Sequence, residues 1–79
     1  MSDYIPIDCG LHSKYELAIM HHHKLRLSWE DIDGQTHVET VTPTDLLARQ
    51  RQEFLVLRNQ NQQTFELRLD RIRSAAVLR

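Results

Sequence analysis

The side chains of this chain that could carry chemistry are histidines, a few clustered carboxylates and one cysteine. Three histidines, His21, His22 and His23, are consecutive, which raises the question of a metal site. Metal ligands on a helix are spaced four residues apart, whereas consecutive residues point to different sides. Imidazoles at the C-terminal end of a helix also interact favourably with its dipole and last carbonyl groups. We therefore predict that these histidines cap and pack a helix and bind no metal.

Catalysis needs groups that this sequence does not bring together. No serine lies in a nucleophile-elbow motif, and two glycines, Gly10 and Gly34, are too few for a phosphate-binding loop. Three carboxylates gather at one predicted turn: Glu30, Asp31 and Asp33. A solvated hairpin tip accounts for these carboxylates better than paired acid–base catalysis does. We predict no enzyme activity, no catalytic residue and no cofactor.

The N-terminal part is predicted to be a helix after an extended segment. Residues 1–12 read as an extended lead-in. Ser13 and Glu16 then form a capping box, which predicts a helix over residues 14–22. This helix is apolar around much of its circumference, so it either packs deeply on a sheet or offers apolar surface to a partner.

A hairpin is predicted next, followed by a short helix. Lys24 to Glu30 alternates as a strand, with its apolar residues Leu25, Leu27 and Trp29 facing inward. Residues 31–34 form the turn and residues 35–41 the returning strand. Pro43 suits the first position of a short helix over residues 45–49, capped by Thr42.

The C-terminal part predicts a second hairpin whose last strand bends. Residues 54–57 are continuously apolar, as in a central strand covered on both faces, and residues 59–63 form a polar turn. Residues 64–70 alternate, but Ile72 falls out of parity, so we predict a bend or bulge at residues 70–71. Residues 75–78 extend the sheet. Sequential antiparallel strands closed by a bent strand predict a mainly β fold, a small Sm-like or SH3-like antiparallel barrel with an N-terminal α-helix.

The size and composition of the chain limit the functions that it can have. Seventy-nine residues predict a single domain over 1–79, and 41% hydrophobic with 27% charged residues is ordinary for a globular protein. The lone cysteine, Cys9, excludes an internal disulfide framework and predicts a reducing, cytoplasmic location. No signal peptide and no membrane-spanning run is expected from this sequence.

Two kinds of binding module remain open. Arg49, Arg51 and Arg58 raise the possibility of RNA binding, and Sm-like folds do bind RNA. However, the aromatic residues are dispersed and the net charge is −1, so no basic aromatic platform is evident. A protein–protein interaction module is the leading interpretation, and a Sm-like module acting directly on single-stranded RNA is the alternative.

Several short segments then occur in one collinear order along nearly the whole chain: Tyr4-Ile5-Pro6-Ile7-Asp8-Cys9, Glu16-Leu17-Ala18, His21-His22, Leu25 and Leu27, Asp33-Gly34, Asp45-Leu46, Glu53-Phe54-Leu55-Val56 and Glu66-Leu67-Arg68-Leu69-Asp70-Arg71-Ile72. This pattern resembles the Rof family of Rho-binding antiterminators, small bacterial inhibitors of transcription termination factor Rho. The resemblance implies a Sm-like barrel that acts as a monomer. It would bind the N-terminal RNA-binding domain of Rho and block the primary site for nascent RNA, without binding nucleic acid directly.

The resemblance also implies a contact surface on the segment after the cysteine, on the first helix and on the loop before the central strand. Carried over by position, its residues are His12, Ser13, Lys14, Glu16, Arg49, Gln50 and Arg51. Better-known members are acidic just after the cysteine, whereas this chain has no carboxylate between Asp8 and Glu16. We therefore expect weaker electrostatic steering from this segment.

Overall fold

The computed structural model describes residues 9–78, so the expectations for residues 1–8 lie outside the described part. One α-helix, five strands and a short 3₁₀ turn follow one another: α1 (Cys9–Met20), β1 (Lys24–Glu30), β2 (Thr36–Arg49), β3 (Gln52–Arg58), β4 (Thr64–Arg68), η1 (Leu69–Arg71) and β5 (Ile72–Leu78). Among these described residues, no helix is long and apolar enough to cross a membrane.

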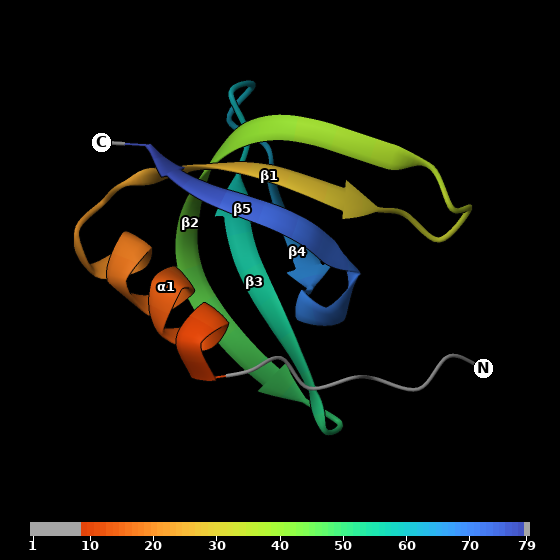
Figure 1. The fold of residues 1–79 in the computed structure, drawn as a ribbon, viewed down its shortest axis with the longest axis horizontal. Coiled ribbons are helices and arrows are strands. Elements are labelled where there is room, and N and C mark those ends of the chain that lie inside the picture. Colours follow the sequence, from red (N-terminus) through yellow and green to blue (C-terminus); the bar gives the residue numbers. More distant parts are fainter. Residues whose placement is uncertain (1–8, 79) are drawn as a thin grey trace.

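The five strands form one antiparallel sheet in the order β4-β3-β2-β1-β5 (Figure 1). The long β2 serves two neighbours: its residues 36–41 pair with β1, and residues 42–49 pair with β3. The register shifts between Pro43 and Asp45, where one residue more stands on β2 than on β3. Such bulges bend a strand and increase its twist, and here the bulge lies where β2 changes partner. The prediction of a mainly β, antiparallel fold with an N-terminal helix is confirmed. Among the described residues, β4 and β5 are the two edge strands of the sheet and do not pair with each other.

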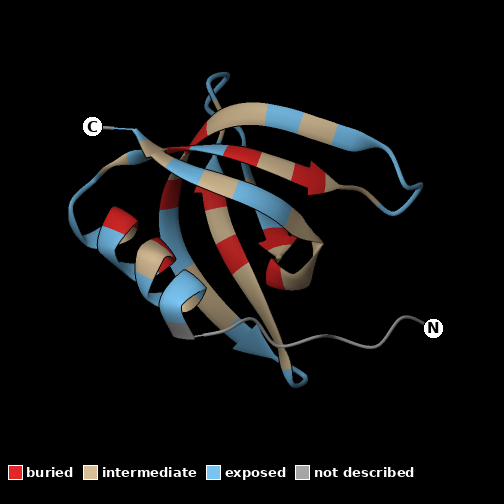
Figure 2. Ribbon diagram, in the orientation of Figure 1, coloured by how far each residue is buried: buried red, intermediate tan, exposed pale blue. Residues whose placement is uncertain are grey.

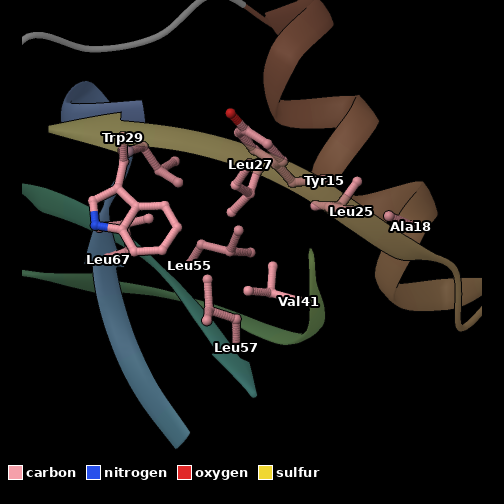
Figure 3. Close-up of a cluster of buried hydrophobic side chains, with 10 residues drawn as sticks. Tyr15, Ala18, Leu25, Leu27, Trp29, Val41, Leu55, Leu57 and Leu67 are labelled. Carbon is pink, nitrogen blue, oxygen red and sulfur yellow. The ribbon is translucent and has the colours of Figure 1, made fainter. Parts of the chain in front are cut away.

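The core lies between the inner face of the bent sheet and α1 (Figures 2 and 3). Its members are at most 7% exposed: Tyr15, Ala18, Leu25, Leu27, Trp29, Val41, Leu55, Leu57, Leu67 and Leu69. On β1 and β3 they stand at alternate positions, which confirms the inward prediction for Leu25, Leu27 and Trp29. Burying a large side chain of this kind stabilises the fold by about 1.5–3 kcal/mol. On β3, Phe54 and Val56 are half-buried, so that strand is not fully covered on both faces.

The helix begins earlier than predicted. It starts at Cys9, so the extended lead-in is wrong for residues 9–12, and Ser13 lies inside the helix, where it caps nothing. A contact with the sheet holds the added turn, because His12 Nε2 lies 2.9 Å from a carboxylate oxygen of Glu53 on β3.

The three histidines do end the helix, although α1 itself stops at Met20. His22 has a φ of +58°, and its amide bonds to the Ile19 carbonyl at 3.2 Å. The His23 amide bonds to the Ala18 carbonyl at 2.9 Å, which completes the pair of bonds of a Schellman motif. The histidines therefore cap the helix as predicted by position, but through their backbone amides and not through their imidazoles.

Two further predictions concern the short helix after the first hairpin and the break near the C-terminus. The short helix predicted over residues 45–49 is wrong, because these residues are the second half of β2 and pair with β3. Pro43 is tolerated there because it stands at the bulge, where a ladder hydrogen bond is already missing. The predicted break at residues 70–71 is confirmed as the 3₁₀ turn η1, which buries Leu69 and separates β4 from β5.

Candidate protein-binding surface

The helix α1 lies beside the second half of β2. Residues 42–49 of β2 pair with β3 on one side, but β1 pairs only with residues 36–41, which leaves the other side of the second half open. Figure 1 shows α1 running along this open side, with its first turn near the end of β2. Covering an exposed strand edge with a helix is a common protection against unwanted pairing. The helix is thereby fixed beside the β2–β3 turn, which carries the other predicted contact residues.

His12 joins the helix to the sheet. Its Nδ1 lies 2.7 Å from an oxygen of Glu16 one turn later, and its Nε2 lies 2.9 Å from an oxygen of Glu53 on β3. The hydrogen bond with Glu16 raises the pKa of His12, partial burial opposes the rise, and Glu53 adds to it. A protonated imidazole donates from both nitrogens, which is what two carboxylates require. His12 and Glu16, both predicted, therefore form one cluster with Glu53.

A groove of about 330 Å³ lies between this helix face and β2. It is lined by His12, Glu16, Ile19, Met20, Asp45 and Leu46. Met20 is 67% exposed, and Ile19 and Leu46 are partly buried against the core. Apolar side chains thus line the groove together with the carboxylates of Glu16 and Asp45. We call it the helix–β2 groove.

Ser13 and Lys14 lie on the other flank of the helix. There a second groove of about 560 Å³ runs between α1 and β5, lined by Gly10, Ser13, Lys14, Leu17, Ala18, His21, His23 and Val77. The Lys14 ammonium donates a hydrogen bond to the Ala75 carbonyl at 2.7 Å and so ties α1 to β5. The structure therefore does not place Ser13 and Lys14 together with His12 and Glu16.

The side chain of Arg49 lies on the outer face of the sheet. It donates to Glu66 of β4 at 2.7 Å, and its guanidinium stands 5.3 Å from the centroid of the Phe54 ring. Glu53 pairs with Ala48, one position before Arg49, and successive side chains of a strand alternate between faces. Arg49 and Glu53 therefore point to opposite sides of the sheet, and Arg49 does not join the His12 cluster.

Gln50 and Arg51 form the two-residue turn between β2 and β3. Their φ angles are +50° and +63°, the sign pattern of a type I′ hairpin turn, which favours Asn-Gly. Both side chains are exposed, and neither is hydrogen-bonded within residues 9–78. Left-handed backbone at two consecutive non-glycine residues costs about 1–2 kcal/mol each, and such strain concentrates at functional positions.

The acidic hairpin tip has an internal role. Asp31 accepts hydrogen bonds from the amides of Asp33 and Gln35, and it lies 2.6 Å from His37 Nε2. These bonds lower the pKa of Asp31, the His37 contact most of all. Within the described part of the chain, no group of three His, Cys, Asp or Glu residues is arranged to hold a metal ion.

Sequence reasoning missed the carboxylates that reach α1 from other strands. Asp45 and Glu53 come from β2 and β3, and their approach depends on the helix lying along β2. The apolar circumference of the helix was the signal for the exposed Met20 and Leu17, which are 67% and 51% exposed. Of the seven predicted contact residues, the structure joins His12 with Glu16, places Gln50 and Arg51 at the adjacent turn, and directs Ser13, Lys14 and Arg49 elsewhere.

Comparison with known proteins gives one match to a family. Residues 6–79 match the family described as modulator of Rho-dependent transcription termination (ROF). No curated protein matches the chain. The match covers the whole of the described structure, including α1, the β2–β3 turn and both hairpins.

Proposed function

Because the chain belongs to the ROF family of modulators of Rho-dependent transcription termination, we propose that it inhibits Rho by occluding its RNA site. In this proposal the protein binds the N-terminal RNA-binding domain of Rho as a monomer, in the bacterial cytoplasm, and nascent RNA can no longer load. The observation that carries the proposal is the helix–β2 groove, where the exposed Met20 and two partly buried apolar side chains lie beside carboxylates. No catalytic step is involved.

Charge complementarity supports this use of the groove. A protein surface that binds RNA is rich in Lys and Arg, because it neutralises phosphates. Glu16, Asp45 and Glu53 surround one side of α1 and outnumber the one imidazolium, His12, that bridges Glu16 and Glu53. The net charge there is therefore opposite to that of such a surface. The sequence after Cys9 lacks carboxylates up to Glu16, and Asp45 and Glu53 supply the missing charge from the sheet. Complementary charges of this kind speed association and select the partner.

Met20 supplies the apolar part of the contact. It is 67% exposed at the end of the helix, beside the half-buried Leu46. Methionine adapts its unbranched side chain to irregular surfaces, and buried apolar anchors supply most of the energy of protein interfaces. Leu11, 37% exposed, adds apolar surface near the start of the same helix.

The β2–β3 turn extends the proposed contact. Its left-handed residues, Gln50 and Arg51, hold the turn backbone in a defined conformation and expose both side chains, and a preorganised backbone loses less entropy on binding. The strain lowers the stability of the free protein, and Asn-Gly at these two positions would relieve it. A role of Gln50 and Arg51 in binding explains why the turn does not have Asn-Gly.

We extend the proposal to the architecture as a Sm-like barrel. Support comes from the bulged β2, which pairs with β1 in one half and with β3 in the other. The 3₁₀ turn η1 adds support, because it carries the chain directly from β4 at one edge of the sheet to β5 at the other. Strands arranged in this way curl towards closure.

The proposal is tested by equilibrium binding to the isolated RNA-binding domain of Rho, with a matched pair of charge variants. Asp45→Asn removes a groove carboxylate, whereas Asp33→Asn removes one from the distant hairpin tip. Asp45→Asn is expected to weaken binding about twofold to fivefold and to reduce its salt dependence. Asp33→Asn is expected to leave both unchanged. Equal effects of the two variants would mean that the groove is not the contact.

Termination itself supplies the functional readout. The protein is expected to increase readthrough at a Rho-dependent terminator, and Asp45→Asn is expected to need more protein for the same readthrough. Binding without increased readthrough would contradict occlusion of the RNA site. Readthrough without binding to the RNA-binding domain would place the contact elsewhere on Rho.

A further inference from the structure

We propose that a polar pocket at the other end of the sheet binds a phosphate group. The pocket has a volume of about 280 Å³ and lies between the start of β1, the middle of β2 and the β3–β4 turn. It is lined by Lys24, Thr40, Thr42, Arg58, Asn59, Gln60 and Gln62. Figure 1 shows the β3–β4 turn at the opposite end of the sheet from the β2–β3 turn, and the pocket shares no residue with the helix–β2 groove. The inference therefore does not depend on the proposed function.

Strand register places these side chains together. Thr42 of β2 is paired directly with Arg58 of β3, and Leu25, next to Lys24, is paired with Val41. Because Leu25, Val41 and Leu57 face the core, their neighbours Lys24, Thr42 and Arg58 face outward on three adjacent strands. The turn from Asn59 to Gln63 stands beside this row and adds amide side chains to its rim.

Within the described residues, the cations of the pocket have no ion-pair partner. Lys24 and Arg58 line it without any carboxylate, and neither forms an ion pair within residues 9–78. Other arginines of the sheet are paired: Arg49 with Glu66, Arg68 with Asp70 and Arg73 with Glu30. A further cation, Arg26, stands on the same face opposite Thr40. Three cations without an ion pair in residues 9–78, Lys24, Arg26 and Arg58, therefore lie on this face of a chain whose net charge is −1.

The lining specifies the chemistry of the ligand. Two cations, two threonine hydroxyls and three side-chain amides can all donate hydrogen bonds to an oxyanion. No aromatic side chain lines the pocket, so stacking on a nucleobase is not part of the recognition. The volume is below the range of about 300–1,000 Å³ typical of drug-sized ligands, which fits a phosphate with little attached to it. The phosphate can belong to a small free ligand or to the backbone of single-stranded RNA.

Gln62 adds a backbone observation at the pocket rim. Its φ is +67°, a conformation that favours glycine, yet glutamine stands there and its side chain lines the pocket. Retaining a strained glutamine is explained if its amide contributes to binding.

The test is a backbone amide NMR titration of the full chain with inorganic phosphate and, in a second arm, with a short oligouridine. Sodium chloride at matched ionic strength serves as the blank. Saturable shifts are expected at Thr40, Thr42 and residues 59–62. Arg58→Gln is expected to weaken binding at least about fivefold, because it removes a charge-assisted hydrogen bond. Arg26→Gln makes the same charge change outside the lining and is expected to change affinity less than about twofold.

The arms distinguish the two sources of phosphate. Saturation by phosphate identifies a small free ligand, whereas saturation by oligouridine alone identifies an RNA backbone. Either result supports the pocket if Arg58→Gln weakens that binding at least about fivefold. Shifts that do not saturate in either arm would overturn the proposal. Equal losses in Arg58→Gln and Arg26→Gln would also overturn it, since they would indicate general attraction between charges.

Discussion

The two hairpin turns that begin at Asp31 and Asn59 allow a sharp test of backbone strain. In both, the side chain of the first residue accepts hydrogen bonds from the amides two and four residues later. In both, the amide three residues later bonds to its carbonyl: Gly34 to Asp31 at 3.0 Å and Gln62 to Asn59 at 3.1 Å. Gly34 and Gln62 thus occupy the same position, with φ angles of +82° and +67°. The position suits glycine, and only one of the two turns has it.

We predict that Gln62→Gly stabilises the protein. A non-glycine residue in the left-handed region costs about 1–2 kcal/mol, and glycine loses about 0.5–1 kcal/mol more conformational entropy on folding. The difference leaves a gain of about 0.5–1 kcal/mol in the free energy of unfolding. For a domain of this size, that gain raises Tm by about 2–8 °C.

The reverse change, Gly34→Gln, serves as the matched control and is expected to lower the free energy of unfolding by a similar amount. A Cβ at Gly34 would have no atom within 4 Å apart from those of Gly34 and its two neighbours in the chain. The loss of stability therefore reflects backbone conformation and not crowding. Urea and thermal unfolding followed by circular dichroism measure both variants. If Gln62→Gly is neutral or destabilising while Gly34→Gln is tolerated, positive φ is not what these turns require, and the reasoning fails.

Three further predictions concern the turn, the core and the helix. Gln50→Gly is expected to stabilise the protein as Gln62→Gly does. It is also expected to weaken binding to the RNA-binding domain of Rho, whereas Gln62→Gly is expected to leave this binding unchanged. Identical binding of the two variants would show that the β2–β3 turn is not part of the contact. Leu55→Ala, at a site that is 0% exposed, is expected to cost about 2–5 kcal/mol in unfolding experiments, whereas Val38→Ala, at a site that is 53% exposed, changes stability by less than about 0.5 kcal/mol. Since the folded pKa of His12 is raised above 6.5, its contribution is fully present below that pH and is lost as pH rises through the folded value. The difference in unfolding free energy between the wild type and His12→Gln should therefore shrink as pH rises, and a difference that grows with pH would contradict the assignment.

The sequence pattern predicted the strands well where alternating apolar and polar residues determine which side chains are buried. Leu25, Leu27 and Trp29 face the core as expected, since a strand with one buried face leaves little freedom of register. The parity slip at Ile72 correctly located a break, although its form, the turn η1, depends on burying Leu69. The errors lie where local signals compete with distant ones. Pro43 is a good first residue of a helix, but pairing with β3 turned residues 45–49 into strand.

The candidate site was less predictable, because it is assembled across the chain. His12 and Glu16 are four residues apart, but Glu53 reaches His12 from a residue 41 positions away. Lys14 and Arg49 were predicted as contacts on the basis of position, and each has a partner within the fold, Ala75 and Glu66. The start of the helix decides whether His12 and Ser13 follow helical spacing, and this start differed from the prediction by five residues: Cys9 against residue 14.

The central claim is that this chain and RNA compete for one site on Rho. The most direct measurement is the equilibrium affinity of the chain for the isolated RNA-binding domain of Rho at increasing concentrations of oligopyrimidine RNA. Competition predicts that the apparent Kd rises in proportion to RNA concentration and that no complex contains the domain, RNA and this protein together. An apparent Kd that stays constant as RNA is added, with all three components in one complex, would contradict occlusion.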